Sequence, residues 1–330
     1  MSPELTVVVP GRSWQMPDAV VALDWSSDGR LLAIAADGAV SVDAGPPIEG
    51  QHGHGVALAG FWAGATAHAC GYRDGTITLA GCDGLHAIPG DAGPLGAMLW
   101  TGAALVTAHR HELVVIGTHP PRPALDLGAG QLRALAALTP SYLVAVGADE
   151  IAFVDIGLHL VDARVDLEGG ISVAADPHAR YVAVGDLAGS IHVLTVGDEA
   201  YGRELSGYPD PVRHLACSRA PAGVIAAADD ELTFWTVNGG EPGNQPTCAI
   251  GHGEPITALA ASPAGLLVAT ADTSGRVCIW HLRDLGGPVW CADGADEITT
   301  IAWSTDGTGL AVGDVSGAIA AWAVTPGMIA

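Results

Sequence analysis

Apolar and polar residues alternate along this chain in short runs, and each run ends at Gly, Asp, Ser or Pro. An alternation with a period of two predicts β-strands, because successive side chains of a strand point to opposite faces of the sheet. The 3.6-residue periodicity of amphipathic helices is weak throughout. We therefore expect an all-β protein.

The alternating runs recur in one repeated unit. It consists of an apolar strand, a short polar turn, a second apolar strand that ends in small residues, an Asp-Gly-like turn and a third strand. Clear copies occupy residues 22–42, 258–280 and 300–322, weaker ones end near residues 79 and 194, and degenerate ones end near residues 116, 154 and 235. The second turn returns every roughly 36 to 44 residues, which is the period of a β-propeller blade.

Eight copies, each completed by a short fourth strand, predict an eight-bladed β-propeller of four-stranded antiparallel blades. Residues 1–330 then form one propeller domain. Seven blades are the alternative, if one degenerate copy is not a blade. The last copy ends near residue 324 and lacks its outer strand, so we expect the N-terminal strand at residues 5–9 to complete that blade and close the ring.

One copy of the unit resembles the WD40 repeat. His252 precedes its first strand, and Thr270, Asp272 and Trp280 follow at the spacing of that family. The resemblance implies that His252, Thr270, Asp272 and Trp280 form a hydrogen-bonded structural tetrad. It also implies a non-catalytic scaffold for protein–protein interaction. The chain departs from the family pattern in having no Trp-Asp dipeptide, and most other copies lack the tetrad.

The charge of the chain narrows the range of partners. Its 36 acidic and 13 basic residues, the latter all arginine, give a formal net charge of −23. Nucleic-acid binding and docking on an anionic membrane both need clustered cations, so neither is expected. We expect a protein partner with a basic surface, and self-association is a further possibility.

Acidic residues concentrate in the turns between the second and third strands of the units. In a propeller these turns share one face, here named the top face, with the loops that lead into each first strand. The candidate partner-binding residues are Asp74, Asp149, Glu150, Asp186, Asp229, Asp230 and Asp314. The alternative is ordinary turn chemistry, because Asp is favoured in tight turns for local hydrogen bonding.

Two His-x-His pairs also fall in top-face loops. His52 and His54 form one pair, and His109 and His111 form the other. Converging imidazoles could bind a metal such as Zn²⁺, which makes a metal-handling protein an alternative function. This spacing fixes no ligand geometry, so we expect no bound metal or other cofactor. In the alternative reading, His52 caps its blade and the other three histidines are exposed.

Catalytic motifs are missing, including Gly-x-Ser-x-Gly, His-Glu-x-x-His and phosphate-binding glycine loops. We therefore do not expect an enzyme, although a propeller-fold enzyme stays the least favoured alternative. The six scattered cysteines predict small buried residues in a reducing compartment. With no evident signal peptide, this predicts a cytoplasmic protein. Trp14 and Trp290 lie outside the repeat register and are the tryptophans we expect to be exposed.

Overall fold

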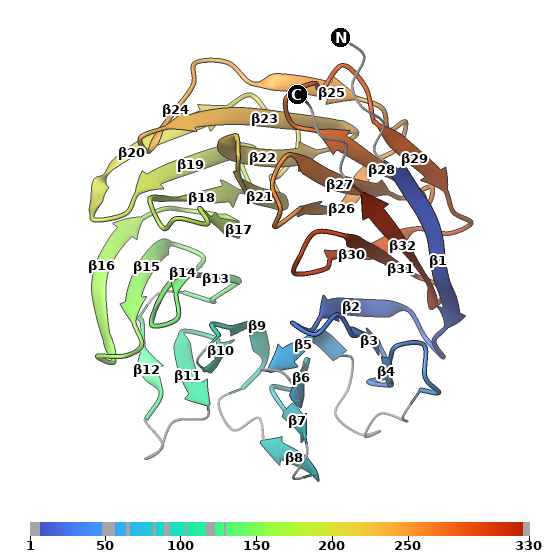
Figure 1. The fold of residues 1–330 in the computed structure, drawn as a ribbon. Coiled ribbons are helices and arrows are strands. Elements are labelled where there is room, and N and C mark those ends of the chain that lie inside the picture. The colour runs from blue at the N-terminus through green and yellow to red at the C-terminus, as the bar shows by residue number, and fades with distance from the viewer. Residues whose placement is uncertain are drawn as a thin grey trace.

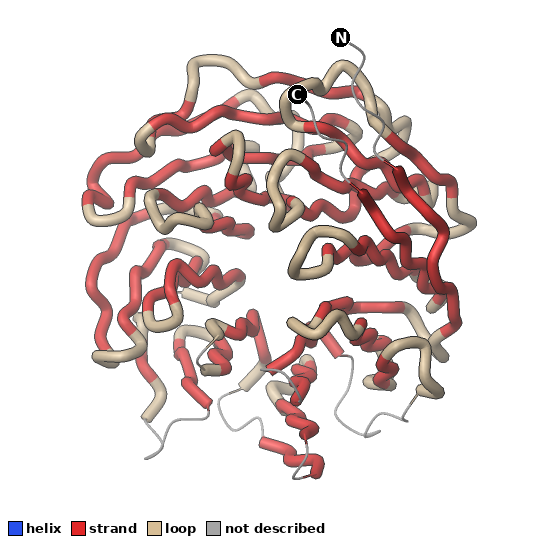
Figure 2. Tube along the Cα trace, in the orientation of Figure 1, coloured by secondary structure: helices blue, strands red, loops and turns tan. Residues whose placement is uncertain are grey.

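The computed structural model describes residues 7–47, 57–63, 67–81, 84–88, 93–102, 104–116, 123–128 and 130–325. Every regular element in these ranges is a β-strand (Figure 2), so the predicted all-β class is confirmed. Within them, no helix is long and apolar enough to cross a membrane.

The strands of the described residues pair into eight antiparallel sheets. The first three contain β2 (Val20–Trp25), β3 (Leu31–Ala35) and β4 (Val40–Val42); β5 (Ala57–Ala63), β6 (Ala67–Tyr72), β7 (Ile77–Gly81) and β8 (Gly84–Ile88); and β9 (Leu95–Trp100), β10 (Leu105–His109), β11 (Glu112–Ile116) and β12 (Leu125–Asp126). The next two contain β13 (Ala134–Thr139), β14 (Tyr142–Val146), β15 (Glu150–Asp155) and β16 (Leu160–Asp166); and β17 (Gly170–Ala175), β18 (Tyr181–Asp186), β19 (Ser190–Thr195) and β20 (Asp198–Ser206). The last three contain β21 (His214–Arg219), β22 (Ala222–Ala228), β23 (Glu231–Asn238), β24 (Glu241–Pro242) and β25 (Thr247–Ile250); β26 (Ile256–Ala261), β27 (Leu267–Asp272), β28 (Arg276–His281) and β29 (Trp290–Asp293); and β30 (Ile298–Trp303), β31 (Gly309–Asp314), β32 (Ala318–Thr325) and β1 (Val7–Gln15).

The sheets are arranged around a centre as the blades of a propeller (Figure 1). Their innermost strands, from β2 through β26, contact one another in chain order, and β30 contacts both β26 and β2. Among the described strands, no sheet closes on itself. The ring is held by packing between neighbouring sheets.

The N-terminal strand β1 lies in the same sheet as the C-terminal strand β32. The two pair antiparallel from Val7 opposite Thr325 to Gln15 opposite Ala318. The strand is longer than the predicted residues 5–9, because it continues to Gln15 past an irregularity between Pro10 and Ser13. Residues 5 and 6 lie outside the described residues. The pairing joins two segments that are far apart in the sequence.

Burial follows the position of each strand in its sheet. The second strands β3, β10, β27 and β31 are buried along their whole length, because neighbouring sheets cover both of their faces. The outer strand β16 instead alternates between exposed and half-buried residues. The core therefore lies between the sheets, which explains why the second strands read as continuous apolar runs and not as alternating ones.

The expectation of six reduced, buried cysteines was wrong in two respects. Cys278 on β28 and Cys291 on β29 occupy paired positions of neighbouring strands and form a disulfide. Cys248 on β25 is a free cysteine and is exposed. The spacing of 13 residues gave no sign of the disulfide, because strand pairing and not sequence distance brings the two sulfurs together.

Candidate functional site

In two of the sheets, the loop before the first strand contacts the end of the second strand on the top face. In the sheet β26–β29, the loop that carries His252 contacts the turn between β27 and β28 at Asp272. In the sheet β9–β12, the carbonyl of Gly93, before β9, contacts His109 at the end of β10. In these two sheets, a loop and a turn thus lie together on this face.

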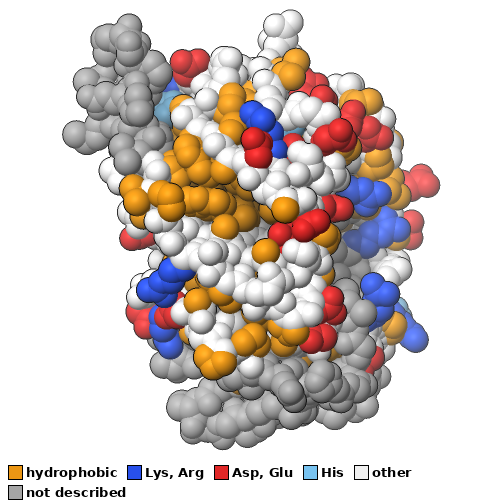
Figure 3. Space-filling model, turned by 90° about the vertical axis from the view of Figure 1, so that its right-hand side faces the viewer, with side chains coloured by type: hydrophobic (Ala, Val, Ile, Leu, Met, Phe, Trp, Pro, Cys, Tyr) orange, Lys and Arg blue, Asp and Glu red, His pale blue; other side chains and the backbone are white. Residues whose placement is uncertain are grey.

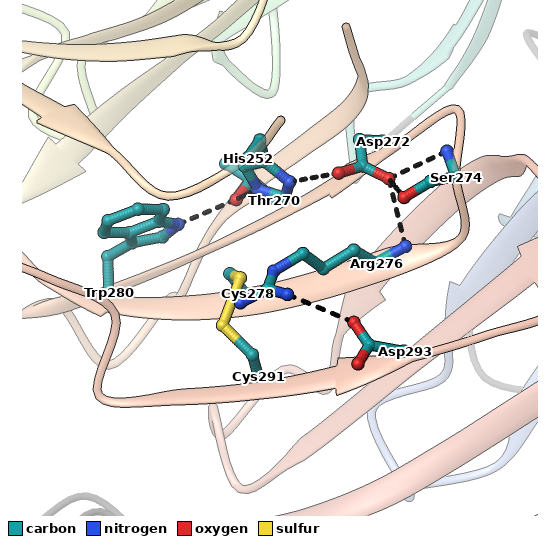
Figure 4. Close-up of a disulfide and its surroundings, with 9 residues drawn as sticks. All are labelled: His252, Thr270, Asp272, Ser274, Arg276, Cys278, Trp280, Cys291 and Asp293. Atoms are coloured by element: carbon teal, nitrogen blue, oxygen red, sulfur yellow. Dashed lines mark hydrogen bonds and ion pairs between the residues drawn. A yellow bond between two sulfur atoms is a disulfide. The ribbon is translucent and has the colours of Figure 1, made fainter. Parts of the chain in front are cut away.

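The four residues of the predicted tetrad lie together in the sheet β26–β29 (Figure 4). The Nδ1 atom of His252 lies 2.7 Å from an oxygen of Asp272, and its Nε2 atom lies 2.7 Å from the hydroxyl of Thr270. The indole N–H of Trp280 donates to the same hydroxyl at 2.7 Å. All four residues are buried. If His252 donates from Nδ1 to Asp272, the indole donates to Thr270 and Thr270 donates to Nε2, so the ring nitrogens, the hydroxyl and the indole N–H of the tetrad all have partners.

The carboxylate of Asp272 also organises its own turn. It accepts hydrogen bonds from the backbone N–H groups of Ser274 and Arg276 and from the Ser274 hydroxyl. Burial acts to raise the pKa of Asp272, but the hydrogen bonds from Ser274 and His252 outweigh it and hold that pKa below its ordinary value. The charged form is therefore the one that this arrangement stabilises.

Other sheets hold related networks that the sequence did not predict. In the sheet β9–β12, Thr107 and His109 occupy the strand positions that Thr270 and Asp272 occupy in β27. The Nε2 atom of His109 lies 2.9 Å from the Thr107 hydroxyl, and its Nδ1 atom lies 2.9 Å from the Gly93 carbonyl. His109 stands at the position that Asp272 holds in β27, so a search for the family's order of residues does not find this network.

A third version occurs in the sheet β21–β25. Tyr208, in the loop before β21, replaces the histidine and contacts the hydroxyl of Thr233 at 2.7 Å. The indole N–H of Trp235 donates to the Tyr208 hydroxyl at 2.8 Å. Burial raises the pKa of Tyr208 above its ordinary value. Trp235 stands at the same position of β23 as Trp280 does in β28, and this shared tryptophan is the sequence signal that could have identified the network.

Two of the candidate partner-binding acids are buried in their turns. Asp186 and Asp314 stand in the same position as Asp272, and each carboxylate accepts from the backbone N–H groups two and four residues later. Asp186 also accepts from His192 at 2.8 Å. Asp186 and Asp314 were candidates for partner binding, but both are buried and accept hydrogen bonds within their own turns, so they do not carry the proposal made below. The shared Asp-x-x-Gly pattern with Asp272 was the available signal.

Four of the remaining five candidates lie in turns between the second and third strands, and Glu150 is the first residue of β15. Asp74, Asp149 and Asp229 are exposed, and Glu150 and Asp230 are half-buried. Glu150 forms an ion pair with Arg164 of β16. Asp74 accepts a hydrogen bond from the Thr76 backbone at 2.8 Å and still exposes its side chain.

The structure does not bring the candidate metal ligands together. His109 is buried and uses both ring nitrogens in the network described above. His111 is about half exposed and lies 4.0 Å from Asp126. His52 and His54 fall outside the described residues. Among the residues that are described, no group of three or more His, Cys, Asp or Glu could hold a metal ion.

A pocket of about 220 Å³ opens between the last sheet and the first, where β1 and β32 face β2 and β3. We name it the closing pocket. Its walls are mainly apolar and include three tryptophans, Trp14, Trp25 and Trp322. Arg12 and Asp43 supply its charges, with a guanidinium nitrogen 3.6 Å from a carboxylate oxygen. The other lining residues are Gly11, Gly29, Leu31, Thr308, Gly309, Ala321 and Ala323.

The side chain of Trp322 packs on the other face of its sheet, toward the sheet β26–β29. The ring of Trp322 lies 5.3 Å from that of Trp290 on β29, nearly edge to face. Figure 3 shows apolar side chains gathered on the side of the molecule where β1 and β29 lie. Trp14 and Trp290, expected to be exposed, are both half-buried. Sequence reasoning missed the pocket because its walls come from opposite ends of the chain.

The tetrad lies in the part of the chain that matches a known family. The profile of the WD40 family, described as "WD domain, G-beta repeat", matches residues 244–281, which contain all four tetrad residues. This match and the arrangement of the sheets as blades support a WD40-repeat propeller. WD40 propellers are in general protein-interaction scaffolds without catalytic activity. No curated protein matches the chain.

Proposed function

We propose that this WD40 propeller is a non-catalytic scaffold that binds a protein with a basic surface through its top face. The observation that carries the proposal is the exposure of Asp74, Asp149 and Asp229 in three separate top-face turns. The half-buried Glu150 and Asp230 flank two of them. A net charge of −23 adds a long-range attraction for a cationic partner, which speeds association and makes it sensitive to salt.

We also propose that each of the eight sheets is one blade, so that the propeller is eight-bladed. The support is the strand pairing together with the contacts between successive innermost strands. A seven-bladed ring is the alternative. An experimental density map viewed along the propeller axis would decide between the two counts.

The location and the oligomeric state stay predictions. The cytoplasmic location predicted from the sequence is opposed by the Cys278–Cys291 disulfide, because disulfides are rare in reducing compartments. Self-association is measured by light scattering of the purified chain.

Metal handling is not proposed, because both ring nitrogens of His109 already contact Thr107 and Gly93.

The test of the scaffold compares two variants with the same change in charge. The first is Asp74→Asn, Asp149→Asn and Asp229→Asn on the top face. The control is Asp162→Asn, Glu241→Gln and Asp284→Asn, which neutralises three exposed acids away from the top-face turns. Affinity for a nona-arginine peptide is measured over a series of salt concentrations.

Each exposed charge pair contributes about 0.2 to 1 kcal/mol, so we expect the top-face variant to bind about threefold to a hundredfold more weakly than the wild type. Its affinity should also depend less steeply on salt, whereas the control should change little. Equal losses in both variants would mean that the whole negative surface attracts the peptide, and the proposed face would be wrong.

A further inference from the structure

We infer that the closing pocket is a binding site for a free α-amino acid with an apolar side chain. This inference is independent of the scaffold function, because the pocket lies between the last and first sheets and contains none of the top-face acids. It rests on three properties of the pocket: its size, its aromatic walls and the pair of opposite charges that lines it.

The size of the pocket sets the size of the ligand. A protein cavity of about 150 Å³ lined by apolar side chains holds benzene. The closing pocket, at about 220 Å³, has room for one branched aliphatic or six-membered aromatic group. It is smaller than the roughly 300 to 1,000 Å³ typical of sites for drug-sized ligands. A single amino-acid side chain matches this volume, and a nucleotide or a larger cofactor does not.

The walls favour an apolar group in the interior. Trp14 and Trp25 present rings from β1 and β2, and burying a hydrocarbon group against them is favourable. Gly309 keeps this space open. A Cβ atom at that position would lie 3.2 Å from the ring of Trp25 and would crowd it.

The charges complement a zwitterion. The side chains of Arg12 and Asp43 are 67% and 37% exposed, so a ligand can reach both. At 3.6 Å their own contact is longer than a hydrogen bond, and such exposed pairs contribute about 0 to 1 kcal/mol, so little is lost when a ligand intervenes. An α-amino acid carries its ammonium and carboxylate on one carbon, which lets it offer its carboxylate to Arg12 and its ammonium to Asp43.

Asp43 is held in place for this role. One of its oxygens accepts a hydrogen bond from the backbone N–H of Leu31 at 3.1 Å. The net charge of −23 also discriminates among ligands, because it repels a simple anion but not a zwitterion with no net charge. The combination favours an amino acid over an aromatic carboxylate of the same size.

The test begins with the wild-type chain, titrated calorimetrically with four probes. L-Phenylalanine and L-leucine carry both the side chain and the zwitterion. Glycine carries the zwitterion alone, and N-acetyl-L-phenylalaninamide carries the side chain without charges. We expect saturable binding of L-phenylalanine or L-leucine at one site per chain, and at least about tenfold weaker binding of the other two probes.

Variants then locate the site. Arg12→Ala and Asp43→Asn should each weaken binding of the preferred amino acid by about tenfold. Asparagine retains an oxygen for the Leu31 contact and tolerates the positive φ of 52° at this position, so Asp43→Asn preserves the turn. Arg276→Ala and Asp293→Asn remove a comparable exposed ion pair, at 3.3 Å, outside the pocket and should leave binding unchanged.

Three results would overturn the inference. The first is no saturable binding of L-phenylalanine or L-leucine up to about 10 mM. The second is equally tight binding of N-acetyl-L-phenylalaninamide, which would make the charges irrelevant. The third is undiminished binding in both pocket variants. Because the probe series uses the wild-type chain, the first two results do not depend on the folding of any variant.

Discussion

Thr270 is the centre of the buried tetrad, so replacing it tests whether the network stabilises the blade. The Thr270→Val substitution keeps the shape of the side chain and removes the hydroxyl. Two buried groups then lose their partner, namely the indole N–H of Trp280 and the Nε2 atom of His252. Neither group can form a hydrogen bond with solvent water instead, because both side chains are buried.

The magnitude follows from the two orphaned groups. Each unsatisfied buried group costs about 1 to 3 kcal/mol, or about 2 to 6 kcal/mol together. The added methyl group of valine returns about 0.8 kcal/mol through burial. We therefore expect Thr270→Val to lower the free energy of unfolding by about 1 to 5 kcal/mol. Thr270→Ser keeps the hydroxyl and should lose less than Thr270→Val.

Urea denaturation followed by circular dichroism measures these differences, and a double-mutant cycle with Trp280→Phe assigns them. Phenylalanine has no N–H, so in that background Thr270→Val orphans only the His252 nitrogen and should cost about 1 to 3 kcal/mol less. A loss below about 0.5 kcal/mol for Thr270→Val, or an identical loss in both backgrounds, would refute the reasoning. The hydrogen bonds of the tetrad would then contribute nothing measurable to the free energy of unfolding.

Two further predictions concern pH and redox state. Because folding lowers the pKa of Asp272, its contribution to stability is present above about pH 4, the range of an unfolded aspartate, and is lost as the pH falls through the folded pKa. Asp272→Asn should therefore depend less on pH than the wild type between about pH 4 and 2 in urea titrations, and an unchanged profile would contradict the assignment. The Cys278–Cys291 disulfide closes a loop of 13 residues and should stabilise the fold by about 3 kcal/mol. A reducing agent should lower the melting temperature of the wild type and leave that of Cys291→Ser unchanged, whereas an equal shift in both would exclude this pair as the cause.

Sequence reasoning worked where a feature repeats locally. The strands, the turns between them and the family tetrad depend on residues a few positions apart, and alternation and spacing report them directly. Sequence reasoning failed to identify the networks in which other residue types make the hydrogen bonds of the tetrad. Thr107 with His109, and Tyr208 with Thr233 and Trp235, make the same kinds of hydrogen bond as the tetrad from a different order of side chains.

The exposure of the turn acids shows a second limit. Asp186 and Asp74 both occur in acidic turns, yet one is buried and the other exposed, because the two carboxylates stand at different positions of the turn. The closing pocket shows a third limit, since it exists only after β1 packs beside β32. No local pattern places Arg12 near Ala323.

The pairing of β1 with β32 can form only after the last strand of the chain has been synthesised. The Gln15 side chain donates to the carbonyl of Ser316, 301 residues later, so β1 leaves the ribosome long before its partner strand is made. At about 5 to 20 residues per second, the wait lasts roughly 15 to 60 s. During that time the apolar segment Val7-Val8-Val9 has no strand to pair with, which gives a chaperone an interval in which to protect it. When β32 has been synthesised, its pairing with β1 both ends this exposure and completes the ring.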